Sequence, residues 1–505
     1  MHDELALLAG VIFVSAFVVV VPACGQSAAP GSHADDDFGT GNGGAFGGGG
    51  PGGNSKVPCT TGLCTLQVTC SNGADTTVSG VVYDPAGKVP LYNVAVYVPN
   101  APVAAIQTGA SCDRCDDRLY SGSPITGAQT DAAGRFKVPH MPAGKDIPLV
   151  MQLGKWRRQI TIPSVSACVD TPLEDKNQTR LPRNQREGNI PRIAITTGGS
   201  DSMECLPLRM GIDIGEFSTM GGPGRVHLYR GDDLVDAANA SDNVYATGQF
   251  SPEVAGGVPF AKSTDLWSST ERLKAYDMVV LSCEGTQNPG SKPPTSAQAL
   301  YDYETIGGRV FASHWHEYFF SHGPALVQST GTWNEGAAQA SGEKTALLQL
   351  TNGAAVFPKG VAFADWLQNV GATAERAHLP IRQARGVLAS VDATKAQEWA
   401  SIPHYPNDGD PAAVQFMSYN APIGAPDEQL CGRAVFTDMH VSSGATQDVA
   451  GRAGTLFPQH CAGYGNPGGV SGVGLSAQEK ALAFMLFDLS SCISNDHEPP
   501  PPIVN

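Results

Sequence analysis

The segment Tyr276-Asp277-Met278-Val279-Val280-Leu281-Ser282-Cys283-Glu284-Gly285 decides the fold of the larger part of this 505-residue chain. From Met278 onward it carries an almost unbroken apolar run, which is typical of a parallel strand buried on both faces. Further strands are expected at Arg192 to Thr197, Val226 to Tyr229, Arg309 to Ser313, Val414 to Ser418 and Arg433 to Thr437. A helix is expected from Ser296 to Ile306. Strands that alternate with helices predict an α/β domain with a mostly parallel sheet over residues 189–493.

The last helix of this domain has a clear start signal. Ser476-Ala477-Gln478-Glu479 is a capping box, in which the serine and the glutamate each satisfy a free backbone N–H group. Apolar residues then follow on nearly every side of the expected helix, with Phe484 and Phe487 among them. A helix that is apolar all round is buried, so we expect it in the core.

Polar side chains gather where the expected strands end. In chain order these ends read Gly198-Gly199-Ser200, Cys283-Glu284-Gly285, His314-Trp315-His316-Glu317 and Asp438-Met439-His440. Ligands of open α/β sheets bind at the carboxyl ends of the strands. The sequence therefore predicts that these groups converge on one site.

One interpretation of this convergence is a divalent metal site. His314 and His316 share a face if the segment is extended, and His440 supplies a distant third ligand. Glu284 or Asp438 adds negative charge. A fourth, open position holds an activated water that hydrolyses an ester, amide or glycosidic substrate.

Two other interpretations need no metal. In the first, Cys283 is a nucleophile activated by His314 or His440 with help from Glu284, and Ser313 is the alternative nucleophile. In the second, the histidines form a satisfied polar cluster or line a noncatalytic ligand pocket. The sequence leaves all of these open.

Residues 58–188 are expected to form a β-sandwich. Short strands are expected at Thr77 to Tyr83, Asn93 to Val98, Thr126 to Thr130, Arg135 to Val138, Ile147 to Leu153 and Arg158 to Ile162. Turn signals such as Asp131-Ala132-Ala133-Gly134 separate them at the spacing found in sandwiches.

This part resembles the carboxypeptidase regulatory-like family. The likeness lies in Val78 to Gly87, in Leu91 to Val96 and in Thr130 to Phe136, with residues 99–125 as an insertion. The resemblance implies a noncatalytic sandwich. It acts either as a spacer or as a binding module for carbohydrate or protein.

The α/β domain resembles the class I glutamine amidotransferase-like fold, in particular its trehalose-utilisation-type branch. Tyr276 to Leu281, Gly307 to Phe311 and Gly432 to Phe436 carry the likeness. The family places a nucleophilic cysteine where this chain has His314, and its catalytic base matches His440. Cys283 falls at the strand end that supplies oxyanion contacts in the family. The resemblance thus implies the fold but does not carry glutaminase chemistry over.

The N-terminus predicts export and lipid anchoring. Leu5 to Val21 is a run of apolar or small residues, as in the core of a secretory signal. Val21-Pro22-Ala23-Cys24 resembles a bacterial lipobox, so residues 1–23 are expected to be removed and Cys24 to carry lipid. Gly25 in place of aspartate favours the outer membrane. The alternative is an uncleaved apolar anchor.

Residues 24–57 are expected to form a flexible tether, and residues 494–505 a Pro-rich tail. Glycine dominates Gly39 to Gly53, and such a segment buries too little apolar surface to fold. The net charge of -16 with only 32 Lys and Arg residues excludes nucleic acid as an expected partner.

The predicted export favours disulfide bonding of the cysteines. The chain has 12 cysteines, which leaves an odd number once Cys24 is set aside. One thiol must then stay free, and Cys283 is the candidate. Cys112-Asp113-Arg114-Cys115 has the spacing of a zinc or redox motif, but no second such pair follows, so disulfide bonding in this loop is expected.

Two functions follow from these observations. The first is an envelope binding or structural protein, tethered to the membrane through Cys24, that contacts polysaccharide or protein. The second is a hydrolase that uses the histidine-rich strand ends.

Overall fold

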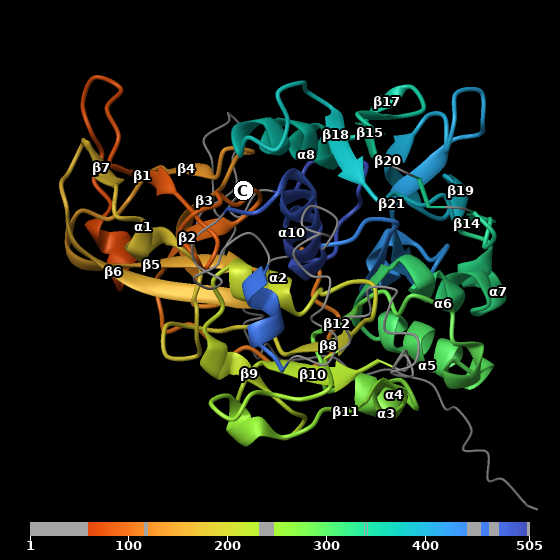
Figure 1. Ribbon diagram of the computed structural model, residues 1–505. Helices are drawn as coiled ribbons and strands as arrows, with labels where there is room; N and C mark the ends of the chain where they lie inside the picture. The colour runs from red at the N-terminus through yellow and green to blue at the C-terminus, as the bar shows by residue number, and fades with distance from the viewer. Residues whose placement is uncertain are drawn as a thin grey trace, which may run out of the picture. The chain divides into compact units, whose positions relative to one another are not determined.

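Figure 1 shows the computed structural model of the chain. It describes residues 59–115, 120–231, 247–337, 339–340, 342–441, 456–463 and 474–501. The predicted signal peptide, Cys24 and the tether lie outside these residues. Among the described helices, none combines the length and the apolar character that a membrane span requires.

The chain is multidomain, and its first part consists of two small β-sheets. One sheet has the antiparallel order β3 (Pro124–Gln129), β2 (Ala95–Pro99), β5 (Gly144–Leu153) and β6 (Trp156–Val165). The other has the order β4 (Arg135–Val138), β1 (Thr77–Val81) and β7 (Asp170–Leu173), with β7 parallel to β1. A short helix, α1 (Lys176–Thr179), follows. The predicted sandwich is confirmed, although β7 was not expected.

The second part is an 11-stranded mixed sheet. Its order is β11 (Ala261–Lys262), β10 (Val226–Arg230), β8 (Ile193–Thr197), β12 (Met278–Leu281), β13 (Arg309–Ser313), β22 (Gly432–Thr437), β21 (Ala413–Ala421), β20 (Gln397–Ile402), β15 (Glu343–Leu348) and β18 (His378–Arg382), with β9 (Phe217–Ser218) beside β10. Pairing is parallel from β11 to β22 and antiparallel from β22 to β18. The predicted mostly parallel α/β sheet is therefore confirmed.

Helices and two small hairpins complete this part. The helices are α2 (Cys205–Arg209), α3 (Ser263–Leu266), α4 (Thr270–Leu273), α5 (Pro294–Thr305), α6 (Tyr318–Ser321), α7 (Ala325–Gln328), α8 (Pro358–Asn369) and α10 (Ala477–Ser490). The hairpins pair β14 (Gly331–Trp333) with β19 (Leu388–Val391), and β16 (Thr351–Asn352) with β17 (Ala355–Val356).

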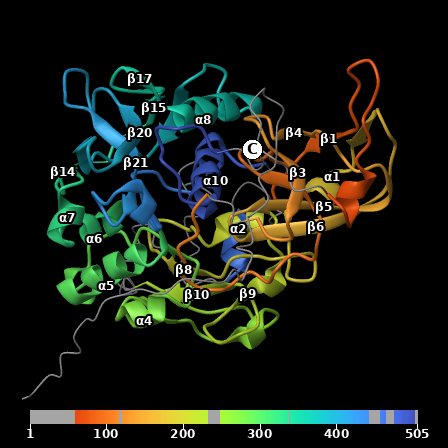
Figure 2. The ribbon, with the colours of Figure 1, turned by 180° about the vertical axis from the view of Figure 1, so that it is seen from behind.

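Helix α10 joins the packing of the two parts. The predicted capping box is present, because the Ser476 side chain accepts a hydrogen bond from the amide three residues on. Phe484 stacks on Tyr92 of the sandwich with ring centroids 6.0 Å apart, and Phe487 meets Trp156 at 6.0 Å. Phe484 also stacks on Phe363 of α8, a helix that lies next to one end of α10 in both views (Figures 1 and 2). One hydrophobic core therefore includes residues of both parts.

Disulfides add covalent links to this core. The pairs are Cys59–Cys64, Cys70–Cys168, Cys112–Cys431, Cys115–Cys492 and Cys205–Cys461. The expectation of disulfide bonding at Cys112 and Cys115 is confirmed, but neither bond stays within the loop. Both tie the insertion between β2 and β3 to the α/β domain. Among the described cysteines only Cys283 is free, as predicted.

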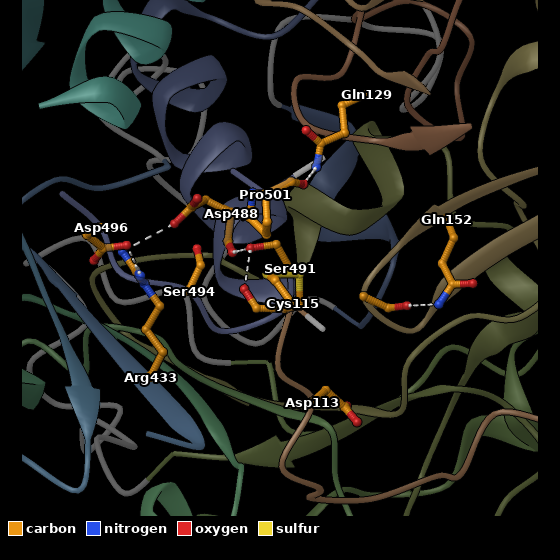
Figure 3. Close-up of a disulfide and its surroundings, with 12 residues drawn as sticks. Asp113, Cys115, Gln129, Gln152, Arg433, Asp488, Ser491, Ser494, Asp496 and Pro501 are labelled. Carbon is orange, nitrogen blue, oxygen red and sulfur yellow. Dashed lines mark hydrogen bonds and ion pairs between the residues drawn. A yellow bond between two sulfur atoms is a disulfide. The ribbon is translucent and has the colours of Figure 1, made fainter. Parts of the chain in front are cut away.

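Figure 3 shows how the Cys115–Cys492 bond holds the end of the chain. The Cys115 amide donates to the Ile493 carbonyl at 3.0 Å. Just beyond, Asp496 pairs with the buried Arg433 at 2.7 Å, and Gln129 of the sandwich donates to the Pro501 carbonyl at 2.8 Å. The described part of the Pro-rich tail is thus bound to the folded body.

We predict that replacing Cys115 and Cys492 together by serine lowers the free energy of unfolding by about 2–5 kcal/mol. The bond spans 377 residues, so its loss frees a long loop in the unfolded chain. Urea unfolding followed by circular dichroism measures the change. The control replaces Cys59 and Cys64, whose separation is only 5 residues, and should cost less. Equal losses in the two variants would contradict the assignment.

Candidate functional site

Parallel pairing brings three strand ends to one level of the sheet. Leu281 of β12 pairs with Ala312 of β13, and Ala312 pairs with Phe436 of β22. Two residues beyond these three positions stand Cys283, His314 and Asp438. The predicted convergence of β12, β13 and β22 at the carboxyl edge of the sheet therefore follows directly from the strand register.

Three of the predicted residues meet in one cluster. Cys283, His314 and His440 each offer a ligand atom, and these atoms all lie within 4.8 Å of one another. The two imidazole rings have centroids 3.7 Å apart at an angle of 39°. All three side chains are buried, with at most 3% of the residue exposed. We call these three residues the Cys–His–His cluster.

His314 reaches the cluster through an unusual backbone conformation. Its φ is 47°, in the left-handed region that non-glycine residues rarely occupy. The residue lies at the sharp change from β13 into the 3₁₀ helix η6 (His314–Glu317). Strain of this kind costs on the order of 1–3 kcal/mol and tends to occur at functional sites. The turn directs the His314 side chain toward β22.

The proton of His314 can be assigned from its surroundings. Its Nε2 lies 3.1 Å from the Asp438 carbonyl oxygen, which only accepts hydrogen bonds, so Nε2 carries the proton and donates it. Burial holds the pKa of His314 well below its usual range, and the ring is therefore neutral. Nδ1 consequently keeps its lone pair. Burial also lowers the pKa of His440 to about 3.

The Cys283 thiol is protonated in this environment. Burial raises its pKa well above the usual value, against the smaller effect of hydrogen bonds from the Trp315 and Gly285 backbone N–H groups. The Cys283 amide donates to Ser313 Oγ at 3.0 Å. A buried neutral thiol is a poor nucleophile. A cation bound beside it favours the thiolate, because metal coordination deprotonates thiols.

Two buried carboxyl groups position the strand ends. Asp438 accepts a hydrogen bond from the Val387 amide at 2.9 Å, and burial raises its pKa to about 8. Asp201 accepts from the Val441 amide at 2.9 Å and from Ser313 Oγ at 3.2 Å. Burial raises the pKa of Asp201 to about 7. Ser313, the alternative nucleophile, is thus engaged with Asp201 and with the Cys283 amide.

His316 lies outside the cluster. The expectation that His314 and His316 share one face of an extended segment is wrong, because residues 314–317 form a 3₁₀ helix. The His316 ring instead packs against Trp267 and Phe319, with centroids 5.9 and 5.8 Å away. Burial lowers its pKa to about 3.

Glu284 is also not placed to assist the activation of Cys283. It forms an ion pair with Lys292, and both side chains are fully buried. The Asn288 amide group donates to the same carboxylate at 3.0 Å. The sequence thus correctly identified Cys283, His314 and His440 as neighbours, but Glu284 and His316 belong to adjacent structural packing.

Two residues of this region were not predicted from the sequence. Asp201 follows Gly198-Gly199-Ser200, and its position after an expected strand was the available signal. Arg385 stacks on Trp315 with its guanidinium carbon 3.7 Å from the ring centroid. It stands alone in a connection between strands, and no motif in the sequence marks it.

Comparisons with known proteins give the following. No family model matches the chain, and no curated protein matches it. Among solved structures, a ThuA-like protein from Bacteroides uniformis ATCC 8492 aligns over 50% of this chain and 85% of its own, with 11% identity and a TM-score of 0.26. Two chains from type II cohesin–X-dockerin complexes of Acetivibrio cellulolyticus also align. The C-terminal interface mutant covers 28% of this chain and 75% of its own, with 15% identity and a TM-score of 0.15. The N-terminal interface mutant covers 27% and 85%, with 17% identity and a TM-score of 0.15.

We predict that Lys292→Met destabilises the protein by about 3–5 kcal/mol, because it leaves the Glu284 carboxylate buried without its cation. The double variant Lys292→Met with Glu284→Gln should recover a large part of that loss, since no buried charge then remains. Urea unfolding of the two variants and the wild type measures both values. A cost below about 1 kcal/mol for Lys292→Met, the level of an exposed ion pair, would show that the pair is not buried as described.

Proposed function

We propose that this chain is an exported, lipid-anchored envelope protein whose α/β domain binds a transition-metal ion, zinc in the first instance. The ligands are Cys283, His314 and His440. The observation that carries the proposal is the convergence of three buried donor atoms within 4.8 Å. This set replaces the one expected from the sequence, because Cys283 takes the place of His316.

The donor chemistry suits zinc. Thiolate sulfur and imidazole nitrogen are the ligands that zinc prefers, at about 2.3 Å and about 2.0–2.1 Å respectively. Both imidazoles are neutral at neutral pH, as ligation requires. The hydrogen bond from His314 Nε2 to the Asp438 carbonyl is the outer contact that orients a metal-bound histidine.

Location outside the cytoplasm is supported by the cysteines. Disulfides persist in oxidising compartments and are rare where thiols are kept reduced. Here ten of the described cysteines are paired, and three of the bonds join residues that are 256, 319 and 377 positions apart. Together with the lipobox-like sequence at Cys24, this favours a protein tethered to the outer membrane.

Binding at the envelope is the first candidate function. The sandwich, through its likeness to carboxypeptidase regulatory-like domains, is the module that contacts polysaccharide or protein. The tether of residues 24–57 gives it a reach of about 30 Å from the membrane. In this proposal the metal stabilises the α/β domain and orders its strand ends.

Hydrolysis is the second candidate function, and one observation favours it. Three protein ligands leave a fourth position on a tetrahedral ion for water, as catalytic zinc sites do. The Asp438 carboxyl group, with its pKa raised to about 8, stands at the same strand end and holds a proton at neutral pH. An ester, amide or glycosidic bond is the expected substrate class.

We predict about one zinc ion per chain in the protein purified from an oxidising compartment, measured by mass spectrometry of the metal content. Cys283→Ser and His440→Ala should each lower the zinc content at least about tenfold, because two remaining ligands bind zinc weakly. His316→Ala should retain the metal. His322→Ala serves as the control, since this side chain is 44% exposed.

Two results would contradict the metal proposal. One is a wild-type protein that takes up no zinc, iron or manganese while folded. The other is a Cys283→Ser variant that is folded and keeps a full complement of metal.

Lipid anchoring makes a separate prediction. In a bacterial host, Cys24→Ser should abolish incorporation of a labelled fatty acid, because the cysteine is the acceptor, while Ser27→Ala should not. Gel detection of the label and fractionation of membranes measure the outcome. A Cys24→Ser protein that stays in the membrane fraction would support the uncleaved anchor instead.

A further inference from the structure

Arg385 carries a buried positive charge next to the Cys–His–His cluster. Only 6% of the residue is exposed. One guanidinium N–H donates to the Ala337 carbonyl at 3.0 Å, whereas Nε has no hydrogen-bond partner among the described residues. Within that same part of the chain, no carboxylate lies within 4.0 Å of the guanidinium. The buried carboxyl groups of Asp438 and Glu317 interact with this charge from farther away, and the Nε donor is left without an acceptor among the described residues.

The contact with Trp315 and the hydrogen bonds of the neighbouring backbone place this guanidinium at the carboxyl edge of the sheet. Its flat face stacks on Trp315, the residue directly after His314, at 3.7 Å. Two residues further on, the Val387 amide donates to the Asp438 carboxyl group at 2.9 Å. The Arg385 carbonyl accepts a hydrogen bond from Gln415 at 2.7 Å, which fixes the backbone. The positive charge also contributes to the lowered pKa of both His314 and His440.

We propose that Arg385 anchors an oxyanion, a carboxylate or phosphate group, of a ligand that binds beside the Cys–His–His cluster. This inference rests on the proposed metal-binding function and adds the chemical class of the ligand. A buried donor without an acceptor is destabilising, so the unpartnered Nε of this positively charged group calls for a negatively charged acceptor.

The geometry of the stack favours an oxyanion in particular. The guanidinium carbon lies over the Trp315 ring, and the N–H groups point outward in the plane of the guanidinium itself. Two parallel N–H groups match the two oxygens of a carboxylate or phosphate. Trp315 is only partly buried, so the guanidinium lies one side chain beneath the surface. A ligand anchored there places its neighbouring atoms toward His314.

The test titrates the full-length, zinc-loaded protein with inorganic phosphate and, separately, with acetate, and follows heat release by calorimetry. Wild type should bind at least one of the two anions, and the arm that binds identifies the source of the oxyanion. Arg385→Gln should weaken binding about 30-fold or more, because a charge-assisted bidentate contact is lost. Arg385→Lys keeps the positive charge but loses the two parallel N–H groups. Its affinity for the anion should lie between those of wild type and Arg385→Gln.

The control is Arg382→Gln, because this arginine on β18 has a side chain that is 59% exposed. It should bind the anion as wild type does. Zinc content should be unchanged in all variants, and circular dichroism verifies that each is folded. The proposal is overturned if wild type binds neither anion, or if a folded Arg385→Gln variant binds as well as wild type.

A parallel titration of metal-free protein separates a failure of the metal proposal from a failure of the oxyanion proposal. If wild type takes up no zinc but still binds the anion in a manner that depends on Arg385, the oxyanion site stands and the metal site falls. If zinc binds but neither anion does, the metal site stands and the oxyanion site falls.

Discussion

The parallel pairing of β12, β13 and β22 is the constraint on which the candidate site depends. Parallel strands place their carboxyl ends on one edge, and the register of Leu281, Ala312 and Phe436 puts the three ends at one level. Cys283, His314 and Asp438 follow these positions by two residues each, so residues more than 120 positions apart in the chain become neighbours. The flanking disulfides and α10 stabilise the sheet that holds this register.

Burial gives the cluster its chemistry. Because the site is buried, the two imidazoles stay neutral and the thiol keeps its proton, so the site is a set of neutral groups rather than an acid–base pair. Such a set suits a cation, which replaces the thiol proton and uses both nitrogen lone pairs. Arg385 lies at the same edge, and its buried Nε has no acceptor among the described residues. In our proposal, a metal ion and this guanidinium together bind a ligand with an oxygen-rich, negatively charged group.

Much of the fold could be predicted from the sequence, because strong local signals coincide with the tertiary structure. β13 has the predicted bounds, and the capping box at Ser476 begins α10 as expected. The strands β15, β18 and β20 were not predicted, since sequences such as Glu343 to Leu348 mix charged and apolar residues without the apolar run of β12. At the site, Cys283 followed from its place at the end of an expected strand, together with the odd cysteine count. The position of His316 was predicted wrongly, because side chains two residues apart share a face only in extended backbone. The positive φ at His314, where the extended backbone ends, cannot be predicted from the residue type.

X-ray absorption at the zinc edge of the metal-loaded protein tests the central claim most directly, because it reports the ligand atoms themselves. The account predicts one sulfur at about 2.3 Å and two imidazole nitrogens at about 2.0–2.1 Å, with one further light atom. The sulfur contribution should vanish in Cys283→Ser. A spectrum of nitrogen and oxygen ligands alone in the wild type, or one with two or more sulfurs, would contradict it.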